Sequence, residues 1–480
     1  MQEIPSYGDW LQKEQAAREL FQKKYPLEKD PFRQKFHLMP PVGYINDPNG
    51  LCFFRGIYHV YLQYCPFSPW GEGGKLWGHY ETENFVTWRR RPPAGTPDTP
   101  WDRDGMYSGS ALPQEDGIRF YYTGNVKESG DFDYIHEGRE HNLIGAFSKD
   151  GKLLERKVLL MRNSDYPGDV TLHVRDPKVW REKGKYYMVL GARSDKDKGL
   201  VLLYSSGDGL KWKVEGRFFS AKHLGYMWEC PDMFRLGKKR ILLFCPQGLR
   251  PEEECFQNGD TCGYAVISRD FRLGGDIGAF EELDRGFDFY AAQTFSGTGE
   301  RRILLGWMGL PNPYENPTVA YGWQHCLSLP RELSFRKGKL WQEPLQELEA
   351  LRKPGGCGTL FKGEKLLLPA DCFEVLLYPE EEKFHAAFRQ DAELVYDGER
   401  LTLRLGESGF GRKERSCRLP EKINCLRIFS DVSSLEIFVN GEVFSTRLFE
   451  THSGSKPMLR MISGSCRWEL YPLRPFEWEE

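Results

Sequence analysis

The sequence has no excess of positive charge, no long apolar run and no closely paired cysteines. Lysine and arginine number 66 against 69 aspartates and glutamates, a net charge of -3, so a nucleic-acid partner is not expected. No segment approaches the roughly 18 apolar residues of a membrane span, and we expect no membrane partner. Residues 1–5 show neither the cationic nor the apolar part of a secretion signal. The twelve cysteines include no C-x-x-C pair, which predicts reduced thiols and a cytoplasmic protein.

The common cofactor and metal motifs are also missing. The chain contains neither G-x-x-x-x-G-K-[ST] nor a G-x-G-x-x-G that opens a helix, so no nucleotide cofactor is expected. Without H-E-x-x-H or two histidines four residues apart, His37, His59 and His79 are interpreted as structural or surface residues rather than zinc ligands. No G-x-S-x-G elbow is present, and Ser108 has no evident histidine partner. We therefore predict an activity that uses carboxylates, with no metal and no organic cofactor.

Glycine (50 residues), proline (30 residues) and aromatic residues (14%) are abundant. Frequent turns and many aromatic side chains favour an all-β protein that could stack rings on a sugar. Residues 1–30 are the exception, because apolar residues recur there at a spacing near 3.6 between Trp10 and Phe21. This pattern predicts one amphipathic helix that ends before Pro26. Its polar face is not strongly cationic, so we expect the helix to dock on the main body rather than on a membrane.

A repeat of about sixty residues extends from residue 31 to residue 350. Each unit has a turn with glycine or charged residues, followed by a short aliphatic and aromatic run. The five runs are residues 55–62, 116–122, 183–190, 237–244 and 300–307. One four-stranded sheet per repeat predicts a five-bladed β-propeller, with an irregular pair of β-sandwiches as the alternative.

The repeat ends at a proline- and glycine-containing break, residues 352–356. Beyond it, residues 425–430 and 434–439 indicate consecutive antiparallel strands, and Asn440-Gly441 is typical of a tight hairpin turn. We assign residues 356–480 to a second all-β domain, a C-terminal β-sandwich.

A polar motif precedes each repeated run at the same phase of the repeat. The five motifs are Asn46-Asp47-Pro48-Asn49-Gly50, Tyr107-Ser108-Gly109-Ser110-Ala111, Arg175-Asp176-Pro177-Lys178, Trp228-Glu229-Cys230-Pro231-Asp232 and Tyr290-Ala291-Ala292-Gln293. If the strand that carries them lines a central channel, Asp47, Asp176 and Glu229 converge, as acid–base chemistry on an uncharged substrate requires. Taken singly, Asp47 could belong to a turn, Asp176 to a structural ion pair and Glu229 to a strand edge.

These motifs continue in series through further segments of the chain. The additional segments are His37-Leu38-Met39-Pro40-Pro41-Val42-Gly43-Tyr44-Ile45, Trp77-Gly78-His79, Phe287-Asp288-Phe289 and Leu329-Pro330-Arg331-Glu332-Leu333. Together they resemble glycoside hydrolase family 32, which includes invertases, fructanases and sucrose-6-phosphate hydrolases, over residues 35–345. The resemblance implies a five-bladed propeller followed by a β-sandwich. It also implies a retaining β-fructofuranosidase that hydrolyses sucrose, sucrose 6-phosphate or short fructo-oligosaccharides through a covalent fructosyl-enzyme.

The resemblance implies a role for each carboxylate. Asp47 corresponds to the nucleophile, Glu229 to the acid/base, and Asp176 to the residue that holds fructose hydroxyls and stabilises the transition state. Arg175 is expected to help keep Asp176 ionised. The substrate-binding residues implied by the resemblance are Tyr44, Asn46, Gln63, Trp70, Tyr107, Ser108, Arg175 and Trp307. Trp307 also fits an ordinary core tryptophan, because it ends a strand.

Some residues near the expected pocket rim differ from the family pattern. Tyr44 and Ile45 stand where the family usually has Trp and Met, and Tyr80-Glu81-Thr82 replaces a small residue and a serine. The segment between Trp70 and Trp77 is longer than expected, so the leaving-group preference and the contact of Trp70 stay open. Two alternatives also stay open: a fructosyltransferase on the same scaffold and a non-catalytic sugar-binding propeller. The N-terminal helix and the sandwich are candidate surfaces for a homo-oligomer.

Overall fold

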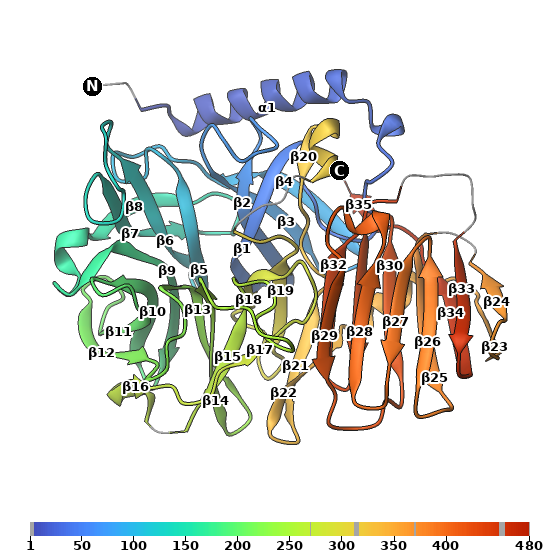
Figure 1. Cartoon of the computed structure of the whole chain (residues 1–480). Coiled ribbons are helices and arrows are strands. Elements are labelled where there is room, and N and C mark those ends of the chain that lie inside the picture. Colours follow the sequence, from blue (N-terminus) through green and yellow to red (C-terminus); the bar gives the residue numbers. More distant parts are fainter. Residues whose placement is uncertain (1–3, 269, 312–315, 369–370, 451–456, 480) are drawn as a thin grey trace.

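The computed structural model describes residues 4–268, 270–311, 316–368, 371–450 and 457–479. The chain consists mainly of β-strands (Figure 1), which confirms the predicted all-β class. Short 3-10 helices interrupt the strands at Leu27–Lys29, Asn163–Asp165, Phe271–Leu273, Pro317–Tyr321, Gln346–Leu351 and Glu407–Gly409. Across the described ranges, no helix combines the length and the apolar character that crossing a bilayer requires.

The N-terminal helix α1 (Tyr7–Lys24) confirms the helix predicted from the apolar spacing. It begins with a capping box at Ser6, which satisfies backbone N–H groups that have no partner inside the helix. Trp10 is buried, and its indole N–H donates to the carbonyl of Pro97 at 3.2 Å. The helix docks beside strand β4 (Thr87–Gly95) and crosses the top of the molecule in Figure 1.

Up to residue 344, the described strands form five sheets, each built from four antiparallel strands taken in chain order. The first contains β1 (Gly43–Phe54), β2 (Ile57–Cys65), β3 (Leu76–Thr82) and β4; the second contains β5 (Met106–Pro113), β6 (Ile118–Lys127), β7 (Arg139–Ser148) and β8 (Glu155–Met161). The third contains β9 (Val170–Glu182), β10 (Lys185–Ser194), β11 (Gly199–Ser206) and β12 (Lys213–Phe219). The fourth contains β13 (Met227–Leu236), β14 (Lys239–Gln247), β15 (Gly263–Ile267) and β17 (Glu281–Glu282); the fifth contains β18 (Tyr290–Thr294), β19 (Ile303–Trp307), β21 (Arg331–Arg336) and β22 (Lys339–Pro344). The five predicted runs are the second strands β2, β6, β10, β14 and β19, and each polar motif lies on the first strand, as expected.

The first strands of these sheets contact one another in a closed order. Strand β1 contacts β5, β5 contacts β9, β9 contacts β13, β13 contacts β18, and β18 contacts β1 again. Short strands from elsewhere extend two of the sheets in parallel pairing: β20 (Trp323–Gln324) and β35 (Glu477–Glu479) join the first, and β16 (Gly275–Asp276) joins the third. The closed order brings segments far apart in the sequence to one place.

Beyond residue 355 the described strands form two six-stranded sheets. One contains β23 (Gly356–Leu360), β34 (Cys466–Pro472), β25 (Phe373–Pro379), β30 (Leu426–Asp431), β31 (Ser434–Val439) and β32 (Glu442–Arg447); the other contains β24 (Lys365–Leu367), β33 (Met458–Ser463), β26 (Phe384–Arg389), β27 (Ala392–Tyr396), β28 (Arg400–Leu405) and β29 (Glu414–Arg418). Buried aliphatic and aromatic side chains from both sheets, such as Ile428 and Leu394, share one core. The predicted hairpin at Asn440-Gly441 joins β31 to β32, whereas β35 leaves this region and joins the first sheet.

Candidate active site

Each of the five first strands has a break in its pairing register at its polar motif. The shifts lie between Ile45 and Pro48, Met106 and Gly109, Arg175 and Lys178, Glu229 and Asp232, and Tyr290 and Gln293. A bulge of this kind releases residues from the ladder and redirects their side chains. Because the five strands form a closed set, the bulges bring the five motifs to the same region of the fold.

The backbone at three of these bulges lies in the left-handed region. The φ angles are 66° at Asp176, 48° at Cys230 and 51° at Ala291. A positive φ is uncommon in residues other than glycine and persists only where the surroundings enforce it. At Asp176 the backbone N–H donates to the hydroxyl of Thr123 at 2.9 Å, which helps to hold this conformation.

Asp47 is held by three neutral side chains. Asn46 Nδ2 donates to its Oδ1 at 2.9 Å, Gln63 Nε2 donates to its Oδ2 at 3.2 Å, and the hydroxyl of Ser108 donates to the same Oδ2. Gln63 also bonds Asn46 and Ser108, at 3.1 and 2.6 Å. The network fixes the Asp47 carboxylate without placing a cation in direct contact with it.

Glu229 and Asp176 meet at the guanidinium of Arg175. Arg175 donates to Glu229 Oε1 from Nε at 3.0 Å and from Nη2 at 2.5 Å, whereas its Nε lies 3.9 Å from Asp176 Oδ2. The hydroxyl of Tyr290 donates to the other oxygen of Glu229 at 2.8 Å. Arg175 therefore bonds Glu229 more closely than Asp176, which the sequence did not predict.

Cys230 connects the carboxylates through its backbone and its side chain. Its backbone N–H donates to Asp176 Oδ2 at 2.9 Å, and its Sγ lies 3.6 Å from Asp47 Oδ2. Asp47, Asp176 and Glu229 come from β1, β9 and β13, and contacts through Cys230 and Arg175 join them into one cluster. The convergence predicted from the phase of the repeat is therefore found.

Burial governs the ionisation of two of these acids. It raises the pKa of Asp176 to about 7; Arg175 opposes the rise, and the charges of Glu229 and Asp47 add to it. Burial also raises the pKa of Asp47, against the hydrogen bond from Ser108, and the charge of Glu229 raises it further. Arg175 therefore favours the ionised form of Asp176, as expected, but desolvation outweighs this ion pair and the pKa stays raised.

Four residues that contact the carboxylates or the predicted residues around them were not predicted. Lys75 Nζ donates to Asn46 Oδ1 at 2.9 Å and lies 5.3 Å from the centre of the Tyr44 ring. His325 packs edge-on against Tyr44 and Trp307. Tyr290 and Cys230 lie within two of the five polar motifs, so the sequence does indicate that they belong to the site. Lys75 and His325 lie outside all five motifs, and nothing local marked them.

The remaining predicted residues lie at different depths. Trp307 is buried and packs edge-on against Tyr44 and Tyr290, so it belongs to the hydrophobic core that also contains Cys230. Tyr107 is partly buried, and its carbonyl accepts a hydrogen bond from the indole of Trp77 at 3.0 Å. Trp70 is 47% exposed on the loop between β2 and β3, and among the described contacts it has none with the carboxylates. The structure thus brings the predicted set together except for Trp70.

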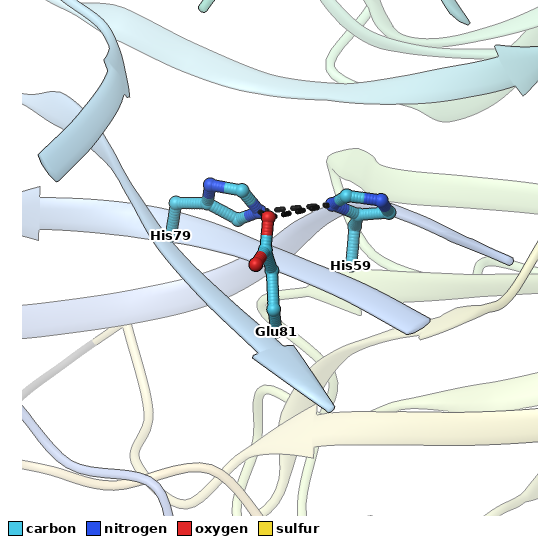
Figure 2. A group of neighbouring side chains, drawn as sticks. All are labelled: His59, His79 and Glu81. Carbon is cyan, nitrogen blue, oxygen red and sulfur yellow. Dashed lines mark hydrogen bonds and ion pairs between the residues drawn. The ribbon is translucent and has the colours of Figure 1, made fainter. Parts of the chain in front are cut away.

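One group of side chains has the donor types of a metal site: His59, His79 and Glu81 (Figure 2). His59 lies opposite Glu81 in the pairing of β2 with β3, and His79 lies two residues before Glu81, so all three share one face of the sheet. His59 Nδ1 and His79 Nε2 are 3.0 Å apart and hydrogen-bonded, and Arg91 Nε donates to Glu81 Oε2 at 2.7 Å. Burial lowers the pKa of His59 to about 4 and that of His79 well below its usual value.

This histidine group has a structural role in the packing of the first two sheets. The two imidazole nitrogens that face each other are used in their mutual hydrogen bond, and Arg91 balances the charge of Glu81. Tyr61 stacks on His79, and the Tyr61 hydroxyl donates to the carbonyl of Gly151 at 2.6 Å. The interpretation of His59 and His79 as structural residues agrees with these contacts, and the absence of a metal from the reaction stays a prediction.

Comparison with known proteins gives consistent matches. The model described as the glycosyl hydrolases family 32 N-terminal domain matches residues 37–344. Sucrose-6-phosphate hydrolase of Bacillus subtilis is 38% identical over 453 residues, covering 90% of this chain and 92% of that protein. Raffinose invertase of Escherichia coli is 36% identical over 441 residues, covering 86% and 89%.

Two solved structures are similar along almost the whole chain. Sucrose-6-phosphate hydrolase from Lactobacillus gasseri has a TM-score of 0.86 and 26% identity, covering 99% of each chain. The Bombyx mori β-fructofuranosidase of family 32 has a TM-score of 0.85 and 28% identity, covering 99% of this chain and 100% of that one. Because the family model spans more than half of the sequence and the relatives cover most of it, this chain belongs to glycosyl hydrolase family 32.

Proposed function

We propose that this protein is a β-fructofuranosidase that hydrolyses sucrose 6-phosphate or sucrose, with short fructo-oligosaccharides as further substrates. The observation that carries the proposal is the junction of Asp47, Asp176 and Glu229 through Cys230 and Arg175. Cleavage of a glycosidic bond needs a nucleophile and a proton donor, and carboxyl groups can supply both. Relatives named as sucrose-6-phosphate hydrolase and raffinose invertase support this choice of substrate class.

The proposed reaction has two steps and retains the configuration of the fructosyl unit. In the first, the Asp47 carboxylate attacks the anomeric carbon of the fructosyl unit, the bond to the leaving oxygen breaks, and Glu229 gives that oxygen its proton. In the second, Glu229 takes a proton from water, the water oxygen attacks the same carbon, and the ester bond to Asp47 breaks. Asp47 and Glu229 end in their starting protonation states, and this mechanism expects their carboxyl groups about 5–5.5 Å apart.

The roles of the surrounding residues follow from their contacts. Asn46, Gln63 and Ser108 hold Asp47 in one orientation, so its attacking oxygen needs little reorganisation. Arg175 and Tyr290 do the same for Glu229. Further residues proposed to contact the sugar are Asp176, Tyr44, Tyr107, Trp70 and Trp307. Aromatic faces suit the C–H side of a sugar, and polar groups suit its hydroxyls.

We also propose the architecture that gathers these residues. The five sheets are the blades of a β-propeller over residues 31–350, the two six-stranded sheets are a β-sandwich over residues 356–480, and residues 1–30 carry the docked helix. The closed order of contacts among β1, β5, β9, β13 and β18 supports the propeller. In this arrangement the innermost strand of each blade lines the central channel.

The activity is tested by comparing kcat/KM for sucrose 6-phosphate, sucrose and a fructan trisaccharide with the purified protein. We expect free fructose from at least one of them, and no release of fructose from any would overturn the proposal. Retention is tested by adding methanol as a competing acceptor. Methyl β-fructofuranoside is expected, and the α anomer as the first product would contradict the two-step mechanism.

A further inference from the structure

Two cations lie opposite each other at the active-site end of the second sheet. Lys127 ends β6 and Arg139 begins β7, and the two are direct partners in the pairing of these strands. The same ladder pairs Gly124 with Met106, the residue before Tyr107. Lys127 and Arg139 therefore extend the sheet just beyond the motif that contributes Tyr107 and Ser108.

Within the part of the chain that the structure describes, neither side chain of this pair forms an ion pair. Asp104, which pairs with Arg103, also accepts from the backbone N–H of Lys127, and its charge opposes the fall that burial causes in the Lys127 pKa. Lys127 Nζ lies 5.4 Å and Arg139 Cζ 5.9 Å from the centre of the Tyr134 ring. The acids nearby are already engaged: Glu128 pairs with Arg103, and Glu140 accepts from Asn142. Like charges that face each other across two strands destabilise a sheet unless something offsets them.

The pair also adjoins the group proposed to protonate the leaving group. Arg139 and His141 lie two residues apart on β7 and so share one face of the sheet, and the charges of Arg139 and Arg175 both oppose the rise that burial causes in the pKa of Tyr107. Arg175 in turn bonds Glu229. The His141 ring lies 5.7 Å from the Tyr107 ring.

Several polar atoms here have no partner within the described residues. They are Arg139 Nε and both ring nitrogens of His141, all buried. The other cations around the carboxylates are already used, because Lys75 bonds Asn46 and Arg175 bonds Glu229. Only the pair formed by Lys127 and Arg139 is therefore available, among the cations named here, to meet a charged group on the substrate.

We propose that Lys127 and Arg139 form a subsite that binds the phosphate of a phosphorylated disaccharide, on the leaving-group side of the cleaved bond. Two cations match a phosphate dianion, and the arginine can bond two of its oxygens at once. The subsite lies beside Glu229, so it meets the glucosyl rather than the fructosyl end of the substrate. This inference rests on the proposed β-fructofuranosidase activity and identifies the residues that select sucrose 6-phosphate.

The test is the ratio of kcat/KM for sucrose 6-phosphate to that for sucrose. Lys127→Met and Arg139→Met are each expected to lower the ratio about tenfold, and the double variant about a hundredfold, as expected for losing charge-assisted hydrogen bonds. Lys127→Arg and Arg139→Lys should retain most of the preference. Lys152→Met removes the same charge from the turn between β7 and β8 and should leave the ratio unchanged.

Binding of products gives an independent readout. Glucose 6-phosphate should inhibit sucrose hydrolysis more strongly than glucose does, inorganic phosphate alone should relieve this difference, and the double variant should lose it. Added salt should lower the ratio in the wild type and not in the double variant. If the double variant has the same ratio as the wild type, or if the wild type does not prefer the phosphorylated sugar, the proposed subsite is wrong and the proposed hydrolase activity stands. A wild type that cleaves neither sugar overturns the proposed function itself.

Discussion

Two clusters of buried charge in this protein behave in opposite ways. The site cluster consists of Asp47, Asp176, Glu229 and Arg175. The interface cluster consists of His37, Asp431, Glu436 and Arg331, where the segment before β1 and the fifth sheet meet the C-terminal sheets. Both clusters have two or more carboxylates that water does not reach freely. They differ in how completely the protein satisfies them.

In the interface cluster each carboxylate has several strong donors. Asp431 accepts from the backbone N–H groups of Lys35 and Phe36 and contacts His37 Nδ1, all at 2.9 to 3.0 Å. Glu436 contacts His37 Nε2 at 3.2 Å and accepts from Arg331 at 2.8 Å. Burial alone would raise the pKa of both acids, but these hydrogen bonds and opposite charges outweigh it, so the pKa of each is lower than its usual value.

In the site cluster burial prevails and the pKa values of Asp47 and Asp176 are raised. Their partners are mostly neutral, and Arg175 bonds Glu229 more closely than Asp176. A buried charge whose hydrogen bonds are all made within the protein stabilises the fold. A buried charge with hydrogen-bonding capacity left over can instead bind a substrate. Mutations in the site cluster should therefore lower activity more than stability, and mutations in the interface cluster should lower stability more than activity.

The largest effect is expected from Asp47→Asn. Removing the proposed nucleophile should lower kcat for the best substrate at least about a thousandfold, while the thermal midpoint stays equal or rises because a poorly compensated buried charge is gone. Steady-state kinetics and thermal unfolding of the same sample check both. Asp116→Asn, in an exposed turn of the second sheet, is the matched control. A residual rate above a thousandth of the wild type would contradict the nucleophile role.

Glu229→Gln should divide substrates by their leaving groups. We expect kcat for sucrose to fall about a hundredfold to ten-thousandfold, because the glucosyl oxygen needs a proton as it leaves. An activated aryl fructoside needs no such proton and should lose much less in its first step. Burst kinetics with both substrates measures this, and equal losses would count against Glu229 as the acid.

The reverse separation is expected from Asp431→Asn in the interface cluster. Breaking this buried pair should lower the free energy of unfolding by about 3–5 kcal/mol, because the amide carries no charge and keeps only one of the two acceptor oxygens that His37 and the backbone N–H groups of Lys35 and Phe36 share. Activity per folded molecule should change little at low temperature. Urea unfolding and kinetics at 10–15 °C below the new midpoint would check this, and a loss of kcat with unchanged stability would remove the distinction between the clusters.

One acid from each cluster, Asp176 and Asp431, should make stability respond to pH with opposite signs. The pKa of Asp176 rises from 3.8 to about 7 on folding, so between these values the folded state holds a proton that the unfolded state has lost. Stability from this group therefore falls as pH rises through that window. The lowered pKa of Asp431 does the reverse: its contribution is present above 3.8 and is lost as pH falls.

Asp176→Asn tests that sign directly. Relative to that of the wild type, the free energy of unfolding of the variant should rise by on the order of 2 kcal/mol from pH 4.5 to pH 7.5. Urea unfolding at the two pH values gives the difference. A difference between variant and wild type that does not change with pH would show that Asp176 does not titrate in this range.

The smallest effect is expected from metal removal. Prolonged dialysis against EDTA should change neither kcat nor the thermal midpoint, because in the proposed mechanism carboxyl groups supply both the nucleophile and the proton, and His59 and His79 bond each other. Metal analysis before and after dialysis accompanies the kinetics. A clear loss of either quantity that added zinc restores would refute the prediction for the reaction and for the histidine group.

Much of the fold could be predicted because its signals are local. Turns followed by aliphatic and aromatic runs gave the second strand of each sheet, and the apolar spacing between Trp10 and Phe21 gave helix α1. The C-terminal strand β35 could not be predicted, because Glu477–Glu479 pairs with a strand some 390 residues earlier and nothing in its own composition indicates that partner.

The candidate site divides in the same way. The convergence of Asp47, Asp176 and Glu229 could be predicted from the chain alone, because the repeat puts all three at one phase and the spacing of a repeat is a property of the chain. The partner of Arg175, the rise of the Asp176 pKa and the positions of Lys75 and His325 follow from the folded arrangement alone. Those features depend on distances between strands and on how much water is excluded, and both are set by packing between segments that the order of residues does not place side by side.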